Sequence, residues 1–365
     1  MALKCGIVGL PNVGKSTLFN CLSNAQALAA NYPFATIEPN IGVVNVPDER
    51  LTKLTELVNP QRVVPTSVEI VDIAGLVAGA SKGEGLGNQF LGNIRDTDAI
   101  VHVVRCFDDD NVVHVSGTVD AVRDKEIIDT ELQLKDLDSI EKKLLKYQRQ
   151  VKTNDKDAIR GTEVLEALKA HIEQGKSART ATIDDKDRIY IDDMNLLTAK
   201  PVLYVCNVED SSVVSGNKHT QALIDAVKAE NAEVLFICAQ MEAEIAQLDT
   251  YEERLEFLQE MGLTEPSINK LIKTCYKMLN LITYFTAGVK EGRAWTIHPG
   301  DKAPQAAGGI HTDFEKGFIR AEVISYADYV LYGSEAAARE VGRLRVEGKE
   351  YVVNDGDVMH FRFNV

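Results

Sequence analysis

Residues 9–16 read Gly9-Leu-Pro-Asn-Val-Gly14-Lys15-Ser16 and match the pattern G-x-x-x-x-G-K-[ST]. The stretch directly follows a short apolar run, Leu3 to Val8, and opens an apolar segment that begins at Thr17. This order of strand, glycine-rich turn and helix is typical of a phosphate-binding loop, because backbone N–H groups at a helix N-terminus then surround the phosphates.

In such a loop the lysine ammonium neutralises the β- and γ-phosphate oxygens, and the hydroxyl that follows it ligates Mg²⁺. We therefore expect Lys15 to take part in catalysis as well as in binding. The residues of this loop predicted to bind a nucleotide are Asn12, Val13, Gly14, Lys15, Ser16 and Thr17.

Four further apolar runs are rich in valine and isoleucine and are separated by helix-like segments. They are Val68 to Val71, Ala99 to Val104, Val202 to Cys206 and Val234 to Cys238. None shows a clean alternation of apolar and polar residues, which is typical of strands buried on both faces of a parallel sheet. The sequence therefore predicts an α/β fold with helices on both sides of the sheet and the ligand at the carboxyl ends of the strands.

A second element of the phosphate site follows the run that ends at Val71. Asp72 and Gly75 form the pattern D-x-x-G, and a carboxylate at this edge can hold the metal through water. Thr36 lies in a loop-like stretch and is the hydroxyl expected to complete Mg²⁺ coordination when a γ-phosphate is bound, although an ordinary loop threonine is the alternative. The predicted metal ligands are Ser16, Thr36 and, through water, Asp72.

Between roughly residues 124 and 198 the chain changes to charged, leucine-bearing segments without strand signals. Leu137, Ile140 and Leu144 recur at helical spacing, and Thr153-Asn-Asp-Lys-Asp interrupts the pattern. An antiparallel helical hairpin inserted in the sheet domain is the natural interpretation. Two alternatives stay open: a protruding docking arm, and helices that only pack on the core.

From about Leu281 short strand signals alternate with turn residues. The strand signals are Thr283 to Thr286, Ala294 to Ile297, Phe318 to Ile324 and Tyr351 to Val353. They are punctuated by pairs such as Pro299-Gly300 and Gly308-Gly309, so the sequence predicts a small mixed β module.

The composition is that of an ordinary globular protein: 365 residues, of which 45% are hydrophobic and 26% charged. A formal net charge of −15 means that the chain as a whole repels polyanions, so any nucleic-acid contact needs a local basic patch. The six cysteines form no C-x-x-C pair, which favours a reducing cytoplasm. No apolar stretch reaches the ~20 residues of a membrane helix, so we expect no membrane partner.

Several stretches resemble the YchF family of Obg-like ATPases, which are P-loop NTPases of the TRAFAC class, and the similarity spans essentially the whole chain. These stretches are Gly9 to Thr17, Asn31 to Asn40, Asp72 to Leu91, Tyr284 to Lys290 and Ile310 to Arg320. The resemblance implies a Ras-like P-loop NTPase domain, an inserted α-helical hairpin domain and a C-terminal TGS domain of β-grasp fold. The boundaries that we assign are 1–124 with 199–280, 125–198, and 281–365.

The base-recognition segment reads Asn207-Val208-Glu209-Asp210 and lacks the lysine of the guanine motif N-K-x-D. The resemblance implies a preference for ATP and an N-x-x-E-like variant. Asp210 departs from that glutamate unless Glu209 takes its place after a slip of one residue. We expect Asn207, Val208 and the backbone near Ala239 to form the base pocket and ATP to be preferred, with a GTPase as the alternative.

Leu76 stands where many GTPases have a glutamine that orients the attacking water, and a leucine cannot do so. Two histidines could replace this glutamine. His102 alternates within an apolar run and is interpreted as a core residue, whereas His114 follows a polar loop that could reach the phosphates. His114 is the predicted catalytic residue, with an ordinary surface histidine as the alternative.

Together these features predict an Mg²⁺-dependent ATPase that acts as a nucleotide-dependent switch. The resemblance implies an association with ribosomes or translation. The alternatives are an Obg-type GTPase, and a nucleotide-dependent ribosome- or RNA-binding module with negligible turnover. RNA contact through the helical or TGS surface is a further possibility, although basic residues there, such as Lys316 and Arg320, have acidic neighbours.

Overall fold

The computed structural model describes residues 3–29, 41–73, 86–248 and 250–364. By the contacts between residues the chain divides into two compact units, each built from separate stretches of sequence. The first comprises 1–44 and 69–271, and the second comprises 45–68 and 272–365. This division does not follow the three predicted domain boundaries, which therefore stay a prediction.

The first unit contains a six-stranded sheet in the order β2-β4-β1-β5-β6-β7, and β4, β1, β5, β6 and β7 run parallel. Its strands are β1 (Lys4–Val8), β2 (Ile41–Asn45), β4 (Ser67–Asp72), β5 (Ala99–Arg105), β6 (Val202–Asn207) and β7 (Glu233–Ile237). All five apolar runs are confirmed as strands, but the predicted burial on both faces does not hold for β7, in which only Ile237 is buried, nor fully for β4. Every residue of β5 and of β6 is buried, which explains why neither run alternates between apolar and polar residues.

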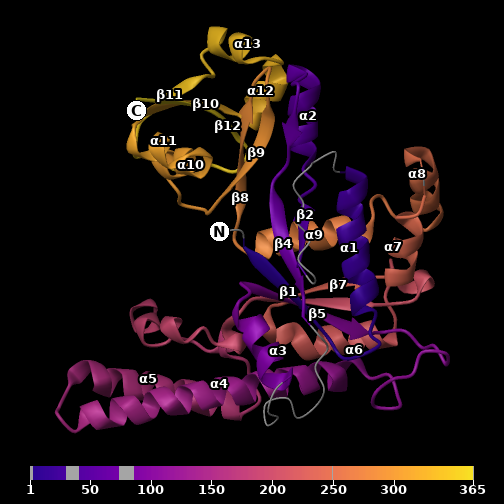
Figure 1. Cartoon of the computed structure of the whole chain (residues 1–365), viewed down its shortest axis with the longest axis vertical. Coiled ribbons are helices and arrows are strands. Elements are labelled where there is room, and N and C mark those ends of the chain that lie inside the picture. Colours follow the sequence, from indigo (N-terminus) through magenta and orange to yellow (C-terminus); the bar gives the residue numbers. More distant parts are fainter. Residues whose placement is uncertain (1–2, 30–40, 74–85, 249, 365) are drawn as a thin grey trace. The chain divides into compact units, whose positions relative to one another are not determined.

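Helices cover both faces of this sheet, as predicted. Figure 1 shows α1 and α7 on one face and α3, α4 and α6 on the other. The bounds of the helices here are α1 (Lys15–Ala29), α3 (Leu86–Arg95), α6 (Lys218–Val227), α7 (Ala239–Ile245), α8 (Tyr251–Glu260) and α9 (Ser267–Met278). The last of these runs on into the second unit.

The predicted helical hairpin is confirmed as α4 (Ala121–Val151) and α5 (Lys156–Glu173), joined by a short turn. Asp120 and Asp155 cap the two helices by accepting hydrogen bonds from backbone N–H groups of the first turn. The beginning of α4 packs on β5 and α6, whereas its second half and α5 share a separate apolar core that includes Ile140 and Leu165. The base of the hairpin packs on the sheet and its tip extends from it (Figure 1), while the docking role of the tip stays a prediction.

The chain returns from α5 to β6 through four 3₁₀ turns, η1 (Ala178–Thr180), η2 (Asp185–Tyr190), η3 (Asp192–Met194) and η4 (Leu197–Ala199). Asp136 of α4 fixes the end of this segment, because its fully buried carboxylate accepts hydrogen bonds from the backbone N–H groups of Leu197 and Thr198 and from the Thr198 hydroxyl. Burial raises the pKa of Asp136, and these hydrogen bonds oppose the shift.

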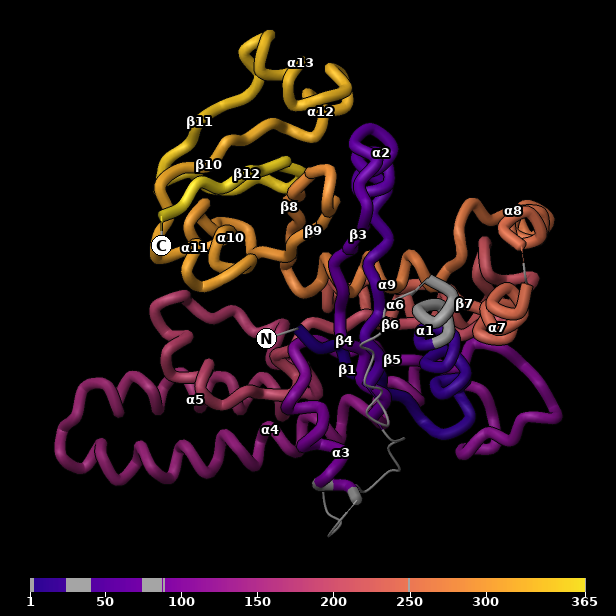
Figure 2. The backbone as a smooth tube through the Cα atoms, turned by 45° about the horizontal axis from the view of Figure 1, so that its top comes forward, coloured from indigo at the N-terminus to yellow at the C-terminus, as the bar shows by residue number. Residues whose placement is uncertain are grey.

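The second unit contains a mixed sheet in the order β11-β10-β12-β8-β9-β3. Its strands are β3 (Val63–Val64), β8 (Ile282–Ala287), β9 (Gly292–Ile297), β10 (Phe318–Ser325), β11 (Arg345–Glu347) and β12 (Asp357–Phe363). Its helices are α2 (Glu49–Val58), α10 (Ala303–Ile310), α11 (Thr312–Lys316), α12 (Tyr326–Tyr332) and α13 (Glu335–Glu340). Figure 2 traces the backbone of α2 and β3, which follow one another along the chain between β2 and β4.

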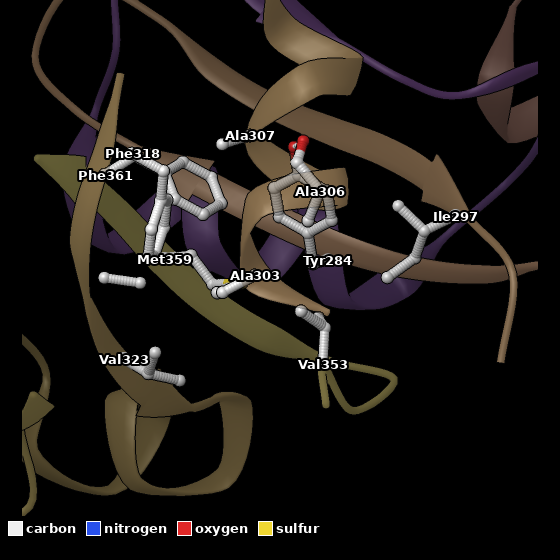
Figure 3. Packing of buried hydrophobic residues seen from close by; sticks show 11 residues of the cluster. Tyr284, Ile297, Ala303, Ala306, Ala307, Phe318, Val323, Val353, Met359 and Phe361 are labelled. Carbon is white, nitrogen blue, oxygen red and sulfur yellow. Dashed lines mark hydrogen bonds between the residues drawn. The ribbon is translucent and has the colours of Figure 1, made fainter. Parts of the chain in front are cut away.

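An apolar core fills the space between α10 and the sheet of this unit. Tyr284, Phe318 and Phe361 pack there against the alanines of α10, as Figure 3 shows. Three of the predicted strand signals are confirmed as β8, β9 and β10. The fourth, Tyr351 to Val353, is wrong as a strand: only Val352 forms an isolated bridge, to Lys302, and the strand is β12 instead.

Within the described part of the chain, no helix has the length and the apolar character that crossing a membrane requires.

Candidate functional site

The predicted phosphate loop lies between β1 and α1, at the carboxyl end of the central strand. Val13 is buried and anchors the loop, whereas Asn12, Ser16 and Thr17 are exposed. Helix α1 begins at Lys15, so the hydroxyls of Ser16 and Thr17 lie in its first turn, beside backbone N–H groups that have no partner within the helix. Unpaired N–H groups at the N-terminus of a 15-residue helix suit an anionic ligand.

Lys15 and Asp72 come together across this loop. The Lys15 ammonium donates to Asp72 Oδ1, and both side chains are largely buried. The register of β1 and β4 explains the pairing, because Ile7 lies opposite Asp72 and both strands end at this edge. The residue predicted to meet the phosphates and the carboxylate predicted to hold the metal therefore share one place.

Asn207 at the end of β6 connects the loop with the next strand. Its Nδ2 donates to the carbonyl of Val13 at 2.9 Å, and its Oδ1 accepts from the backbone N–H of Ala239 at 3.0 Å. A Cβ on Gly14 would lie 2.2 Å from Nδ2 of Asn207, and Gly14 has a φ of 92°. Only glycine combines this conformation with this close approach. Asn207 therefore orients the loop from its base.

The two carboxylates after Asn207 lie in different environments. Glu209 accepts hydrogen bonds from the Ser212 hydroxyl and from Nδ2 of Asn217. Burial opposes the lowering of its pKa, and these hydrogen bonds outweigh burial, so the pKa lies below its usual range. Asp210 is exposed, and among the described contacts its carboxylate accepts only from the N–H of Ser211. Of the two, Asp210 is the carboxylate that is available to a base. Val208, two residues earlier in the chain, is buried.

Arg105, at the end of β5, shapes the loop that carries His114. This residue is 1% exposed, and its guanidinium donates to the carbonyls of Phe107, Asp109 and Val112. Asn12 then contacts the same loop, because its Nδ2 donates to the carbonyl of Val113 at 3.1 Å. The sequence analysis did not single out Arg105, although an arginine directly after a buried apolar run was a usable signal.

His114 is buried, and both of its ring nitrogens are engaged. The backbone N–H of Ser116 donates to Nδ1 at 3.0 Å, so the ring proton lies on Nε2, which contacts Asp124 Oδ2 at 2.7 Å. Asp124 belongs to the first turn of α4. The structure thus ties His114 to the base of the helical hairpin, and the exposed-surface alternative does not hold because the residue is 8% exposed.

His102 is the core residue that the sequence indicated. It is 2% exposed within β5 and lies against the ring of Tyr204, with 5.5 Å between the centroids. Burial lowers its pKa to about 4, so the imidazole is neutral. The predicted roles of Thr36 and Leu76 lie outside the described residues.

The residues present fit a nucleotide with a divalent cation. The loop offers a glycine cradle, helical N–H groups without partners in the helix, the ammonium of Lys15 and the hydroxyl of Ser16, and Lys15 contacts the carboxylate of Asp72. Among the described residues there is no group of three or more His, Cys, Asp or Glu side chains that could hold a metal alone. A cation at this place would therefore depend on the phosphates for part of its coordination, as is usual for Mg²⁺.

Two family models match the chain. One, described as 50S ribosome-binding GTPase, matches residues 4–159. The other is the YchF GTPase C-terminal model, described as a protein of unknown function, and it matches residues 281–364.

Relatives match over the full length of the chain. Two curated proteins named ribosome-binding ATPase YchF cover it completely and are themselves covered completely: that of Haemophilus ducreyi is 55% identical over 365 residues, and that of Bacillus subtilis 54% over 367. The solved structure of the Schizosaccharomyces pombe YchF GTPase is 39% identical, covers 99% of this chain and 97% of its own, and has a TM-score of 0.89. The names of these relatives thus differ in the nucleotide, ATP or GTP, that they imply.

Proposed function

The chain belongs to the YchF family, and we propose that it is a magnesium-dependent ATPase that binds the ribosome and acts as a nucleotide-dependent switch. One observation carries the proposal: the phosphate loop, with Lys15 and Asp72 in contact, is held by Asn207, while Val208 stands where a guanine-specific protein has lysine. The proposal of ribosome binding is supported by the names of the bacterial relatives.

ATP is the proposed substrate, with Asn207, Val208 and the backbone at Ala239 around the base. A buried valine offers apolar cover without the lysine stem that covers guanine. One observation favours a second candidate, a GTPase: Asp210 stands at the fourth position of the motif, is exposed, and can accept from a guanine edge.

The proposed metal ligands are Ser16, Thr36 and, through water, Asp72. Bound Mg²⁺ would neutralise charge on the β- and γ-phosphates. Triphosphate binding requires Lys15 to exchange its contact with Asp72 for contacts with phosphate oxygens. Asp72 is then released to face the cation, so one exchange of partners prepares both residues.

His114 remains the proposed catalytic residue. In the described contacts its Nε2–H is directed to Asp124 and its Nδ1 accepts from Ser116, so neither nitrogen is available to a water molecule. Hydrolysis through His114 therefore requires one of these contacts to open. We therefore expect slow basal turnover. This expectation is also compatible with the alternative, a nucleotide-dependent binding module with negligible turnover.

Cytoplasmic localisation is part of the proposal. All six cysteines are buried free thiols, which suits a reducing compartment. RNA contact is the less supported part, because basic residues of the second unit have acidic partners, such as Arg345 with Glu347 and Asp357. Ribosome affinity that falls steeply with added salt would support phosphate contacts.

The test is steady-state hydrolysis of ATP by the wild type and by the variants Lys15→Ala and His114→Ala. We expect Lys15→Ala to lose ATP binding, and His114→Ala to keep binding while kcat falls by roughly 10²-fold or more. Lys53→Ala is the matched control, since Lys53 is an exposed lysine of α2 that pairs only with Glu56 among the described contacts. Unchanged hydrolysis by Lys15→Ala would overturn the site assignment.

A further inference from the structure

The second unit contains a cavity of about 610 Å³ that the nucleotide site does not use. This volume lies within the range of ligand-binding pockets, roughly 300–1,000 Å³. Its walls are residues 286–291 at the end of the β8–β9 hairpin, Ile310 and Phe314 on α10 and α11, and residues 359–363 of β12.

The cavity lies along the edge of a strand. Side chains alternate between the two faces of a sheet, so a cavity on one face touches only every second residue. Here all five consecutive residues from Met359 to Phe363 line it. Residues whose side chains point to opposite faces of the sheet can all line one cavity only if that cavity lies along the edge of β12.

Strand pairing accounts for this edge. β12 pairs with β10 over its whole length, from Asp357 to Phe363, but with β8 only at Val358 and Phe285. β8 itself stays paired with β9 as far as Ala287. The two strands therefore separate after Val358, and among the described strands none pairs with β12 beyond that point on this side.

Backbone groups on this edge need partners. In an antiparallel ladder, the N–H and C=O groups of alternate residues point to opposite sides, so those of β12 that are not bonded to β10 face the cavity. An unpaired strand edge is a template for another extended chain.

The walls define which chain would fit. Phe314 and Phe363 stack with 3.6 Å between their centroids, and Val289, an apolar residue that is 71% exposed, lies at the rim. The lining contains one acidic residue, Glu291, and three basic ones, Lys290, His360 and Arg362. Arg362 lies 3.5 Å from Glu322 and Glu291 lies 3.8 Å from Arg293, whereas Lys290 has no ion pair among the described residues.

We propose that this cavity binds an extended peptide segment of a partner protein, which adds as a strand to the edge of β12. Alternate apolar side chains of the peptide enter the cavity beside the stacked rings of Phe314 and Phe363, and the acidic side chains that alternate with them face Lys290 and His360. The edge offers room for about five residues of an extended chain. Single-stranded RNA suits the cavity less well, because a surplus of so few cationic groups neutralises few phosphates.

The test uses the full-length protein and a fluorescent peptide that alternates glutamate with valine over about seven residues. Two N-methylated versions of this peptide, one for each set of alternate amides, keep the side chains and remove one set of backbone donors. We expect the parent peptide to bind and one N-methylated version to bind about tenfold less tightly or worse. Hydrogen exchange should slow at amides of β12 between residues 359 and 363 when the parent peptide is bound.

The variant Lys290→Glu should weaken binding of the same peptide several-fold. The matched control is Lys316→Glu, which reverses the charge of another exposed lysine that does not line the cavity. Absence of binding at millimolar peptide, equal binding of both N-methylated versions, or preferential, salt-sensitive binding of an oligouridine probe would each overturn the proposal.

Discussion

Gly14 joins backbone conformation to function at a single position. Because an added Cβ would approach the amide nitrogen of Asn207 at 2.2 Å, Gly14→Ala must displace either the loop or the side chain that orients it. We expect the free energy of unfolding to fall by about 1–3 kcal/mol and nucleotide affinity to fall more than about tenfold. Urea unfolding and equilibrium binding measure the two effects.

The control for this substitution is Gly92→Ala. Gly92 is exposed in α3, and a Cβ there meets no atom within 4 Å, so alanine should be neutral or slightly stabilising. If both variants behave alike, the assigned contact between the loop and Asn207 is wrong.

His102 makes stability depend on pH. Burial lowers its pKa from 6.5 to about 4, while the unfolded chain keeps the ordinary value. Above pH 6.5 neither state is protonated at this residue. As the pH falls from 6.5 towards 4, the unfolded chain binds a proton that the folded chain does not, so stability is lost, by about 3 kcal/mol in all.

Urea unfolding at several pH values, for the wild type and for His102→Leu, measures this contribution. The variant should lose less stability between pH 7 and pH 5 than the wild type. The comparison isolates His102, because Asp136 and Glu242, whose pKa values burial raises, are present in both proteins and act in the opposite direction. Identical pH profiles would contradict the neutral state of His102.

Helix α4 is attached to the sheet unit by buried charges. The Glu230 carboxylate forms two ion pairs: Oε1 lies 2.7 Å from Nζ of Lys125, and Oε2 lies 2.6 Å from Nη2 of Arg179. All three side chains are about nine-tenths buried. Glu230→Ala leaves two cations without this partner, so we expect a loss of roughly 3–5 kcal/mol in the free energy of unfolding. Glu230→Gln should lose less, because it keeps hydrogen-bond acceptance.

An exposed pair of the same helix supplies the control. Asp138 contacts Lys142 at 2.7 Å, but these side chains are 47% and 71% exposed, so Asp138→Ala should change stability by less than about 1 kcal/mol. A comparable loss in both variants would show that the buried network does not anchor α4.

At this scale the sequence predicted the elements whose signal is local. The five strands, the helical hairpin and its turn are confirmed, because apolar runs and helical spacing are properties of neighbouring residues, whereas the partial burial of β7 depends on the fold. β12 was missed, although the sequence from Met359 to Phe363 alternates between apolar and basic residues. The pairing of Val63 and Val64 with Gly292 and Arg293 depends on distant parts of the chain, which no local pattern reveals.

The phosphate loop was predictable for the same reason, since its residues are contiguous. Tertiary contacts decided the rest: Arg105 holds the loop before His114, and Asn217 holds Glu209, leaving Asp210 free. The hydrogen bond between His114 and Asp124 could not be predicted from the sequence either, because it depends on how a loop packs against the first turn of α4. The catalytic role of His114 stays a prediction.

For the whole molecule, chain connectivity links the nucleotide site to the second unit. The excursion 45–68 belongs to the second unit and is flanked by β2 and β4, and β4 ends at Asp72. The chain enters the second unit again at residue 272. The nucleotide-binding sheet and the unit with the peptide-sized cavity are thus joined by more than one covalent connection.

Nucleotide choice is the central claim, and the most direct test is equilibrium binding of ATP and of GTP, each with Mg²⁺, to protein freed of nucleotide. The account predicts that ATP binds at least about tenfold more tightly, a difference of about 1.4 kcal/mol. Tighter binding of GTP by that margin would contradict it, and would mean that Asp210 selects guanine without the lysine that Val208 replaces.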